Sequence, residues 1–223
     1  MGRPCVLLSM QVEVWMDVVC PWCYIGRRRF EQALELHPRR VEVEVLYRSF
    51  ELDPGATSDS SRSLDELLAS KYGVTPAEAA AANRHVAELA AQEGLEFHLE
   101  KAHPTNTLDA HRLLQLARVR RIRSAVEERF QRAYFCEGAA ISDPTTLLRL
   151  GVEAGLKESD IRQVLGGQAF TLQVRNDEKE AREWGARGVP FFVFDRNLKI
   201  FGAQPKEAFQ RALSAGTQLG NVL

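Results

Sequence analysis

Two segments near the start of the chain alternate hydrophobic and polar residues, the pattern of strands with one buried face. Every second residue of 11–16 is Val or Met, and residues 41–47 begin with the same alternation. Between these segments, apolar residues recur at helical spacings from Trp22 until Pro38 ends the pattern. The sequence therefore predicts a strand, helix, strand unit whose crossover helix makes the two strands parallel.

The middle of the chain is predicted to be almost entirely helical. A polar stretch rich in Ser and Asp, residues 56–63, precedes it and is typical of a surface linker. A capping box around Pro76 predicts one helix, and residues 121–135 are expected to continue, after a bend, the helix that starts near Asn106. Residues 95–99 are the one piece that suggests an extended conformation. Further ends are predicted at Gly138, Ser142-Asp143-Pro144 and Ser159-Asp160.

Strand patterns return only near the end of the chain. Residues 170–184 predict a charged helix, residues 190–194 and 198–202 predict a β-hairpin, and Pro205 starts a last helix. The two strand-containing parts have to share one sheet, so the helices between them are interpreted as an insertion. The predicted class is α/β, with one discontinuous domain made of residues 10–62 and 168–215 and a helical insertion domain made of residues 63–167.

Composition narrows the possible partners. The 223 residues carry 29 Lys and Arg against 30 Asp and Glu, so the net charge of -1 gives no overall attraction to nucleic acid or acidic lipid. The arginine-rich residues 118–132 include acidic residues and are interpreted as a solvated face. No apolar run approaches the roughly 18 residues of a membrane span or a signal-peptide core. We expect a cytoplasmic protein without nucleic-acid or membrane partners, whose native start is either Met1 or Met10.

Cys20-Pro21-Trp22-Cys23 lies where the first strand ends and the first helix begins. Two residues between cysteines on a helical turn let the sulfurs meet, and a helix N-terminus favours negative charge on the first sulfur. Cys20 is therefore the predicted nucleophile and Cys23 the resolving thiol. Pro21 suits the first helical position, and Trp22 offers an apolar surface beside the sulfur to a substrate chain.

A structural zinc site is the alternative for this cysteine pair. Such a site needs a second pair of ligands at close spacing, and the other cysteines, Cys5 and Cys136, are isolated in the sequence. No metal site is predicted. Cys136 is expected to be a small buried thiol and Cys5 a free one, since no spacing argument supports a disulfide between them.

Pro190 directly precedes the aromatic strand, where it offers no donor to the sheet. One explanation is a cis bond in a tight turn, and the other is an ordinary trans proline that starts a strand. The redox motif upstream favours the cis bond, because a shared sheet turns this loop toward the cysteines. The backbone of Val189 is then expected to pair with an extended substrate segment.

Residues 17–23, the helical insertion and residues 188–193 together resemble the DsbA-like thioredoxin-fold family. Tyr24-Ile25-Gly26, Phe50-Glu51-Leu52 and residues 106–112 are similar to its cytoplasmic FrnE subgroup of thiol-disulfide oxidoreductases. The resemblance runs from about Val12 to Leu213. It implies a thioredoxin fold of βαβ and ββα halves with the helical domain overhanging the active site, Cys20 as nucleophile, Cys23 as resolving thiol and Pro190 as a cis-proline.

Two departures from related proteins affect the expected chemistry. Well-studied periplasmic members have histidine where this chain has Trp22, so the disulfide is expected to be less strongly oxidising. A related branch, the kappa-class glutathione transferases and the 2-hydroxychromene-2-carboxylate isomerases, carries serine at the first cysteine position. Both cysteines are present here, which favours redox exchange.

Three further polar residues are candidates for the site. Asp109 and His111 lie near the start of an inserted helix, and the resemblance suggests a place in the substrate pocket. Their local alternatives are a favourable interaction with the helix dipole for Asp109 and a hydrogen-bonded interior position for His111. Asp17 is either a proton acceptor during resolution or a residue that fixes the turn before Cys20.

The leading hypothesis is a thiol-disulfide oxidoreductase that needs no cofactor beyond its own redox-active disulfide. The expected partners are protein disulfides or dithiols, with glutathione as a co-substrate or thioredoxin as a further partner, and the protein is expected to be a monomer or a homodimer. One alternative is a glutathione-dependent isomerase or transferase acting on a small aromatic or polyketide-like molecule. The other is a chaperone-like binding module without catalytic activity.

Overall fold

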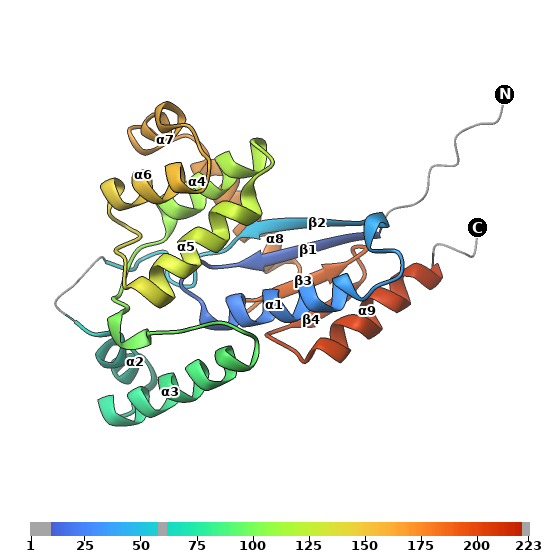
Figure 1. The fold of residues 1–223 in the computed structure, drawn as a ribbon, viewed down its shortest axis with the longest axis horizontal. Helices are drawn as coiled ribbons and strands as arrows, with labels where there is room; N and C mark the ends of the chain where they lie inside the picture. Colours follow the sequence, from blue (N-terminus) through green and yellow to red (C-terminus); the bar gives the residue numbers. More distant parts are fainter. Residues whose placement is uncertain (1–9, 58–61, 220–223) are drawn as a thin grey trace.

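The structure, a computed structural model, describes residues 10–57 and 62–219. Within them, the two ends of the chain build one mixed sheet in the order β2-β1-β3-β4, which crosses the centre of the molecule in Figure 1. Its strands are β1 (Met10–Met16), β2 (Val43–Ser49), β3 (Phe191–Phe194) and β4 (Leu198–Phe201). The predicted α/β class and shared sheet are confirmed. The predictions for Met1 and Cys5 lie outside the described residues.

Strand pairing follows the predicted plan. β1 and β2 are parallel, with Met10 opposite Val43, and β3 is antiparallel to both β1 and β4. The turn between β3 and β4 has positive φ angles of 47° at Asp195 and 51° at Arg196. Positive φ at both central residues matches the twist of a tight hairpin. This turn therefore sets the β3–β4 register, with Phe194 opposite Leu198.

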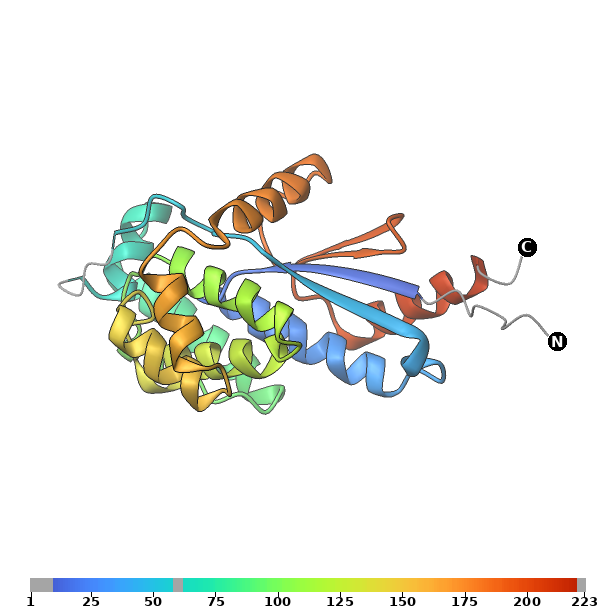
Figure 2. The same cartoon turned by 90° about the horizontal axis from the view of Figure 1, so that it is seen from above.

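Helices cover both faces of the sheet. Figure 2 shows α1 (Pro21–Glu35) and α9 (Lys206–Leu219) on one side and α8 (Thr171–Glu183) on the other. Successive side chains of β3 pack against the helices on opposite faces of the sheet, since strand side chains alternate between faces. Phe192 packs in the α1 and α9 core, and Phe191 packs in the core that contains Ala181 of α8.

The inserted helices gather at one end of the sheet (Figure 1). They are α2 (Leu64–Tyr72), α3 (Pro76–Gln92), α4 (Leu108–Val119), α5 (Arg123–Glu137), α6 (Pro144–Glu153) and α7 (Glu158–Leu165). Their hydrophobic core includes Phe130 and Phe135 of α5 together with Tyr24 and Ile25 of α1. Helix α1 is therefore shared between the sheet layer and the helical region, while the domain boundaries at 62/63 and 167/168 stay a prediction.

Several local predictions require correction. The second strand starts at Val43 rather than residue 41, because residues 40–42 form the 3-10 turn η1 (Arg40–Glu42), whose backbone bonds are local. Residues 95–99 form no strand and lead into η2 (Leu99–Lys101). Residues 108–137 form two helices, since Arg121 adopts a φ of 59° between them. The cap of α7 is Lys157, which leaves Ser159-Asp160 inside its first turn.

Other predicted helix ends are confirmed. At the start of α3, the Thr75 hydroxyl accepts the Glu78 N–H and the Glu78 carboxylate accepts the Thr75 N–H, which is a capping box. Asp143 caps α6. Gly138 ends α5 in the left-handed conformation. Thr107 is the cap residue of α4, but the Asn106 side chain still accepts the Leu108 N–H at 3.0 Å.

Charged side chains join α1 to the helical region. Arg27 donates to Gln131 and Ser124 of α5, Arg28 pairs with Glu128 at 3.1 Å, and Arg29 pairs with Glu93 at 2.6 Å. These arginines follow the cysteines in sequence, but their guanidinium groups are engaged with the protein itself.

Arginines of the run at residues 118–132 also form ion pairs within the protein. Arg120 pairs with Asp160 and Arg129 with Glu137 and Glu153. Arg123 is only 6% exposed and lies beside Glu127, so the prediction of a wholly solvated face is wrong for this residue.

We expect Phe30→Ala to lower the free energy of unfolding by about 3–5 kcal/mol, because Phe30 has no exposed surface and its ring contacts those of Phe192, Phe194 and Phe209. Urea denaturation followed by circular dichroism measures the change. Phe201→Ala is the matched control, since Phe201 is 50% exposed, and its expected cost is below about 1.5 kcal/mol. Equal costs for the two variants would contradict this account of the core.

Candidate active site

The two cysteines sit at the junction of β1 and α1. Cys20 is the N-cap of α1, with extended backbone angles and Pro21 in the first helical turn. The Cys20 carbonyl accepts the N–H groups of Cys23 and Tyr24 at 3.0 and 3.3 Å. Both thiols are free and largely buried, with Cys20 3% and Cys23 0% exposed, whereas Trp22 is 38% exposed beside them. The site is thus a dithiol with one exposed aromatic neighbour.

The proline loop faces the first cysteine. The Val189–Pro190 peptide bond is cis, and the Cys20 thiol donates to the Val189 carbonyl oxygen at 3.5 Å. The loop is held from its other side, where the Pro190 carbonyl accepts the Gly202 N–H at 2.8 Å. The structure therefore brings Cys20, Val189 and Pro190 together, while their role in binding a substrate chain stays a prediction.

Gly26 permits this approach. A Cβ atom at this position would lie 2.9 Å from Pro190 Cγ and 3.2 Å from Ala203 Cα, closer than ordinary packing permits. Sequence reasoning quoted Gly26 only within a motif of the resemblance. Its role depends on a contact between residues 164 positions apart, which no local pattern reveals.

Asp17 is the polar centre of the site. It is 1% exposed; its backbone N–H donates to Cys23 Sγ at 3.5 Å, and its carbonyl accepts the Cys20 N–H at 3.2 Å. Its carboxylate accepts the Leu52 N–H at 2.8 Å and lies 3.2 Å from His111 Nε2. Asp17 therefore fixes the turn before Cys20, as one of the two interpretations predicts, and, in addition to burial, its charge raises the pKa of the Cys23 thiol.

The Cys23 thiol has a higher pKa than an ordinary cysteine. Burial raises the pKa of the Cys23 thiol well above its usual value, and the hydrogen bond and charge of Cys20 raise it further. The charge on Asp17 acts in the same direction. Cys23 therefore holds its proton in the reduced protein, and that proton has to leave whenever its sulfur attacks.

The remaining candidates are placed differently. His111 has no exposed surface, so it lies against Asp17 in the interior rather than at a substrate-facing wall. Asp109 pairs with Arg112 at 2.6 Å, and the same guanidinium donates to the carbonyls of Val164, Gly167 and Ala169 before α8. Asp109 thus helps to hold the α7–α8 connection.

Sequence reasoning also missed the acidic cluster behind the site. Glu51 is buried, and Arg175 bridges its carboxylate to that of Glu178. Glu51 stands in the motif Phe50-Glu51-Leu52, which supplied a resemblance but no chemistry. Among the described residues, no group of three or more His, Cys, Asp or Glu side chains is arranged to hold a metal ion.

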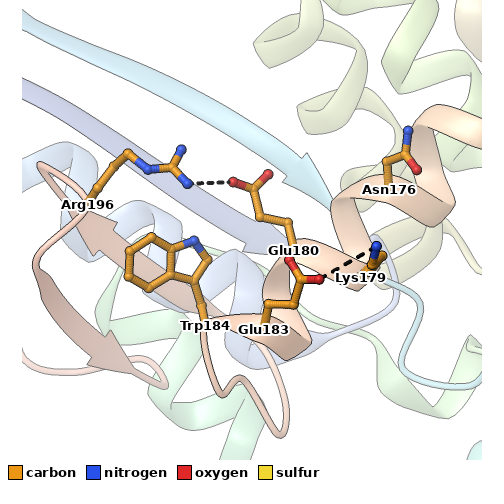
Figure 3. Close-up of a pocket in the computed structure, with 6 residues that line it drawn as sticks. All are labelled: Asn176, Lys179, Glu180, Glu183, Trp184 and Arg196. Atoms are coloured by element: carbon orange, nitrogen blue, oxygen red, sulfur yellow. Dashed lines mark hydrogen bonds and ion pairs between the residues drawn. The ribbon is translucent and has the colours of Figure 1, made fainter.

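A surface hollow lies elsewhere, on α8 and the β3–β4 turn (Figure 3). Arg196 pairs there with Glu180 at 3.1 Å, and its guanidinium lies 5.3 Å from the centre of the Trp184 ring. Its lining contains neither cysteine nor the cis-proline. The hollow is therefore separate from the cysteine site. Its lining residues are Asn176, Lys179, Glu180, Glu183, Trp184 and Arg196.

We expect Gly26→Ala to lower the free energy of unfolding by about 1–3 kcal/mol, since the added methyl group pushes against Pro190 and Ala203. Gly55→Ala is the control, because its nearest contact is 3.5 Å away in an exposed turn, and its expected effect is below about 0.5 kcal/mol. Urea titration of both variants measures the difference. A fully stable Gly26→Ala protein would show that the loop is not held against α1.

In the native reduced protein at about pH 7, we expect iodoacetamide to modify Cys23 more slowly than Cys20 or Cys136, because Cys23 is fully buried and its pKa is raised. Mass spectrometry of peptides taken at increasing times measures each rate. Unfolding in urea is expected to make the three rates similar. A native Cys23 that reacts as fast as Cys20 would contradict the placement of this thiol.

Comparisons with known proteins agree with this geometry. The model of the DSBA-like thioredoxin domain matches residues 11–214. A structure described as a probable DsbA oxidoreductase, from Streptomyces coelicolor, is 42% identical with a TM-score of 0.90, covering 94% of this chain and 91% of the other. The cytosolic disulfide reductase DsbM from Pseudomonas aeruginosa, solved with GSH, is 18% identical with a TM-score of 0.65, covering 94% and 98% of the two chains.

One curated relative is an uncharacterized protein, YwbO, from Bacillus subtilis, which is 26% identical over 93% of this chain and 97% of its own length. The family model covers nearly the whole chain, including both cysteines, the inserted helices and the proline loop. In the described part of the chain, no helix is both long and apolar enough to cross a membrane. The chain therefore belongs to the DsbA-like thioredoxin domain family.

Proposed function

We propose that the protein is a thiol-disulfide oxidoreductase that exchanges disulfides with protein or small-thiol partners. The observation that carries the proposal is the Cys20 thiol at the N-terminus of α1, 3.5 Å from the Val189 carbonyl of a cis-proline loop and backed by a second buried thiol. Membership in a family that includes oxidoreductases supports the same chemistry.

The mechanism follows from the positions of the two sulfurs. Cys20 Sγ attacks a partner disulfide, and the N-terminal end of α1 stabilises the negative charge on this sulfur whenever it is the attacking or leaving group. Cys23 then attacks Cys20 Sγ, which closes the intramolecular disulfide and releases the partner thiol. In the reverse direction, the same steps transfer the disulfide to a partner dithiol.

An extended partner chain is proposed to lie against Val189 and Pro190, with the exposed Trp22 ring as its apolar neighbour. Glutathione is the proposed small-thiol partner, and a solved neighbour with GSH bound supports it. That neighbour is named as cytosolic, which supports our proposal that the protein works in the cytoplasm.

Equilibration in glutathione redox buffers tests the proposal. We expect a reversible Cys20–Cys23 disulfide with a midpoint between ~-270 and ~-120 mV, because the two sulfurs share one helical turn and exchange readily. Peptide mapping by mass spectrometry after acid quenching measures the oxidised fraction. Cys136→Ser is the control and is expected to leave the midpoint unchanged, since Cys136 lies at the end of α5, bonded to the Glu96 carbonyl.

The single-cysteine variants decide between exchange and other chemistry. Cys23→Ser is expected to accumulate a glutathione adduct on Cys20, whereas Cys20→Ser is expected to form none at Cys23. A wild-type protein that never closes the pair and keeps glutathione on Cys20 would overturn the proposal in favour of a glutathione-dependent isomerase or transferase. A protein that neither closes the pair nor reacts with glutathione would favour a binding module.

A further inference from the structure

Behind the cysteines, ionisable side chains continue from Asp17 into the interior. His111 of α4 has no exposed surface, and its Nε2 lies 3.2 Å from Asp17 Oδ1. The second ring nitrogen, Nδ1, is also buried and has no hydrogen-bond partner among the described residues. A buried polar atom is unfavourable unless a partner satisfies it, so we expect Nδ1 to take a second partner such as a bound water.

Glu51 supplies a second buried atom without a partner. The residue that follows it, Leu52, donates its N–H to Asp17 Oδ2 at 2.8 Å, so Glu51 begins beside the Asp17–His111 pair. Its Oε1 is buried and unpartnered in the described part of the chain, while Oε2 binds Arg175. Burial raises the pKa of Glu51, whereas the charges of Arg175 and then His111 lower it, as expected for close neighbours.

These groups form a path from the buried sulfur toward solvent. Cys23 has no exposed surface at one end, and the Arg175 side chain is 39% exposed at the other. Burial raises the pKa of the Tyr134 phenol on α5, and the charge on Asp17 raises it further. The ionisable groups beside His111 from the neighbouring elements are Asp17 and Glu51. Tyr134 interacts in turn with Asp17, and Arg175 joins Glu51 to Glu178.

We propose that His111 relays the Cys23 proton between Asp17 and Glu51, so that the buried thiol exchanges protons with solvent during the resolving step. The inference rests on the proposed function and deepens it. His111 does not touch the reacting sulfurs, so it acts through Asp17 as a positioning residue. The unpaired Nδ1 and the unpaired Oε1 of Glu51 are the two atoms that this relay requires.

In the disulfide-forming direction, the resolving step replaces the bond between Cys20 and the partner sulfur by a bond between Cys20 and Cys23. The Cys23 sulfur forms the bond to Cys20 Sγ, and the bond between Cys20 and the partner sulfur breaks. Its electron pair leaves with the partner sulfur, which takes a proton from water. The Cys23 proton passes through a water to the Asp17 carboxylate and on to His111 Nε2, the ring being in the tautomer that carries its proton on Nδ1. His111 Nδ1 then releases its own proton through one water to Glu51 Oε1, and Glu51 returns it to solvent.

Rapid mixing of the reduced protein with excess glutathione disulfide separates the two chemical steps. Acid quenching and mass spectrometry follow first the adduct on Cys20 and then its conversion into the Cys20–Cys23 disulfide. We expect His111→Gln to slow the second step at least about tenfold at about pH 7, because Gln still bonds to Asp17 but relays no proton. The first step is expected to keep its rate.

Two matched variants sharpen the test. Glu51→Gln is expected to slow the second step in the same way, and the double variant is expected to be no slower than either single one, since both interrupt one path. His85→Gln is the control, because this histidine of α3 is 68% exposed and pairs only with Glu88 of its own helix among the described residues. Thermal unfolding monitors the folded state, and Glu51→Gln decides the question if His111→Gln does not fold.

The pH profile separates a relay from a packing defect. The deficit of His111→Gln is expected to shrink as the pH rises, because hydroxide then offers the Cys23 proton another acceptor. An unchanged second step, a loss equal in both steps or at every pH, or additive losses in the double variant would overturn the inference. In each of these cases the wild-type pair still closes, whereas failure of the proposed function shows itself as a wild-type pair that never closes.

Discussion

Burial of the Asp17 carboxylate is the constraint on which the rest of the site depends. A buried charge is tolerated only where hydrogen bonds and partners surround it, and Asp17 obtains them from separate parts of the chain. Leu52 donates from the segment after β2, and His111 approaches from α4. The Asp17 backbone meanwhile bonds Cys20 and Cys23. One residue therefore holds the strand end, the inserted helices and the two thiols in a single arrangement.

This constraint explains why the helical region belongs to the active site. The insertion delivers His111 to Asp17, and its α5 engages the first turns of α1 through Glu128 and Gln131. The pair Tyr24 and Ile25, directly after Cys23, also packs into its hydrophobic core. A change in the packing of the inserted helices would thus be transmitted directly to the helix that carries both cysteines.

The sequence predicted the parts of the fold that short-range patterns determine. Alternation located β1, and a dense aromatic and β-branched run located the β3–β4 hairpin. Thr75, Gly138 and Asp143 marked helix ends because capping is a local interaction. The errors arose where the tertiary structure decides. Val41 continues the alternation but belongs to η1 and is 89% exposed, and Ser159-Asp160 resembles a cap although the helix already starts at Glu158.

The candidate site also combines a local motif, which the sequence reveals, with contacts between distant residues, which it does not. Four adjacent residues sufficed to identify the cysteine pair, because the motif itself brings the sulfurs together. The contacts of Gly26 with Pro190, and of Asp17 with His111, join residues 164 and 94 positions apart and have no signature in spacing. Burial adds a requirement for proton transfer, because the environment that keeps Cys23 protonated also separates its proton from solvent. A site of this kind therefore depends on interior polar residues as much as on its cysteine motif.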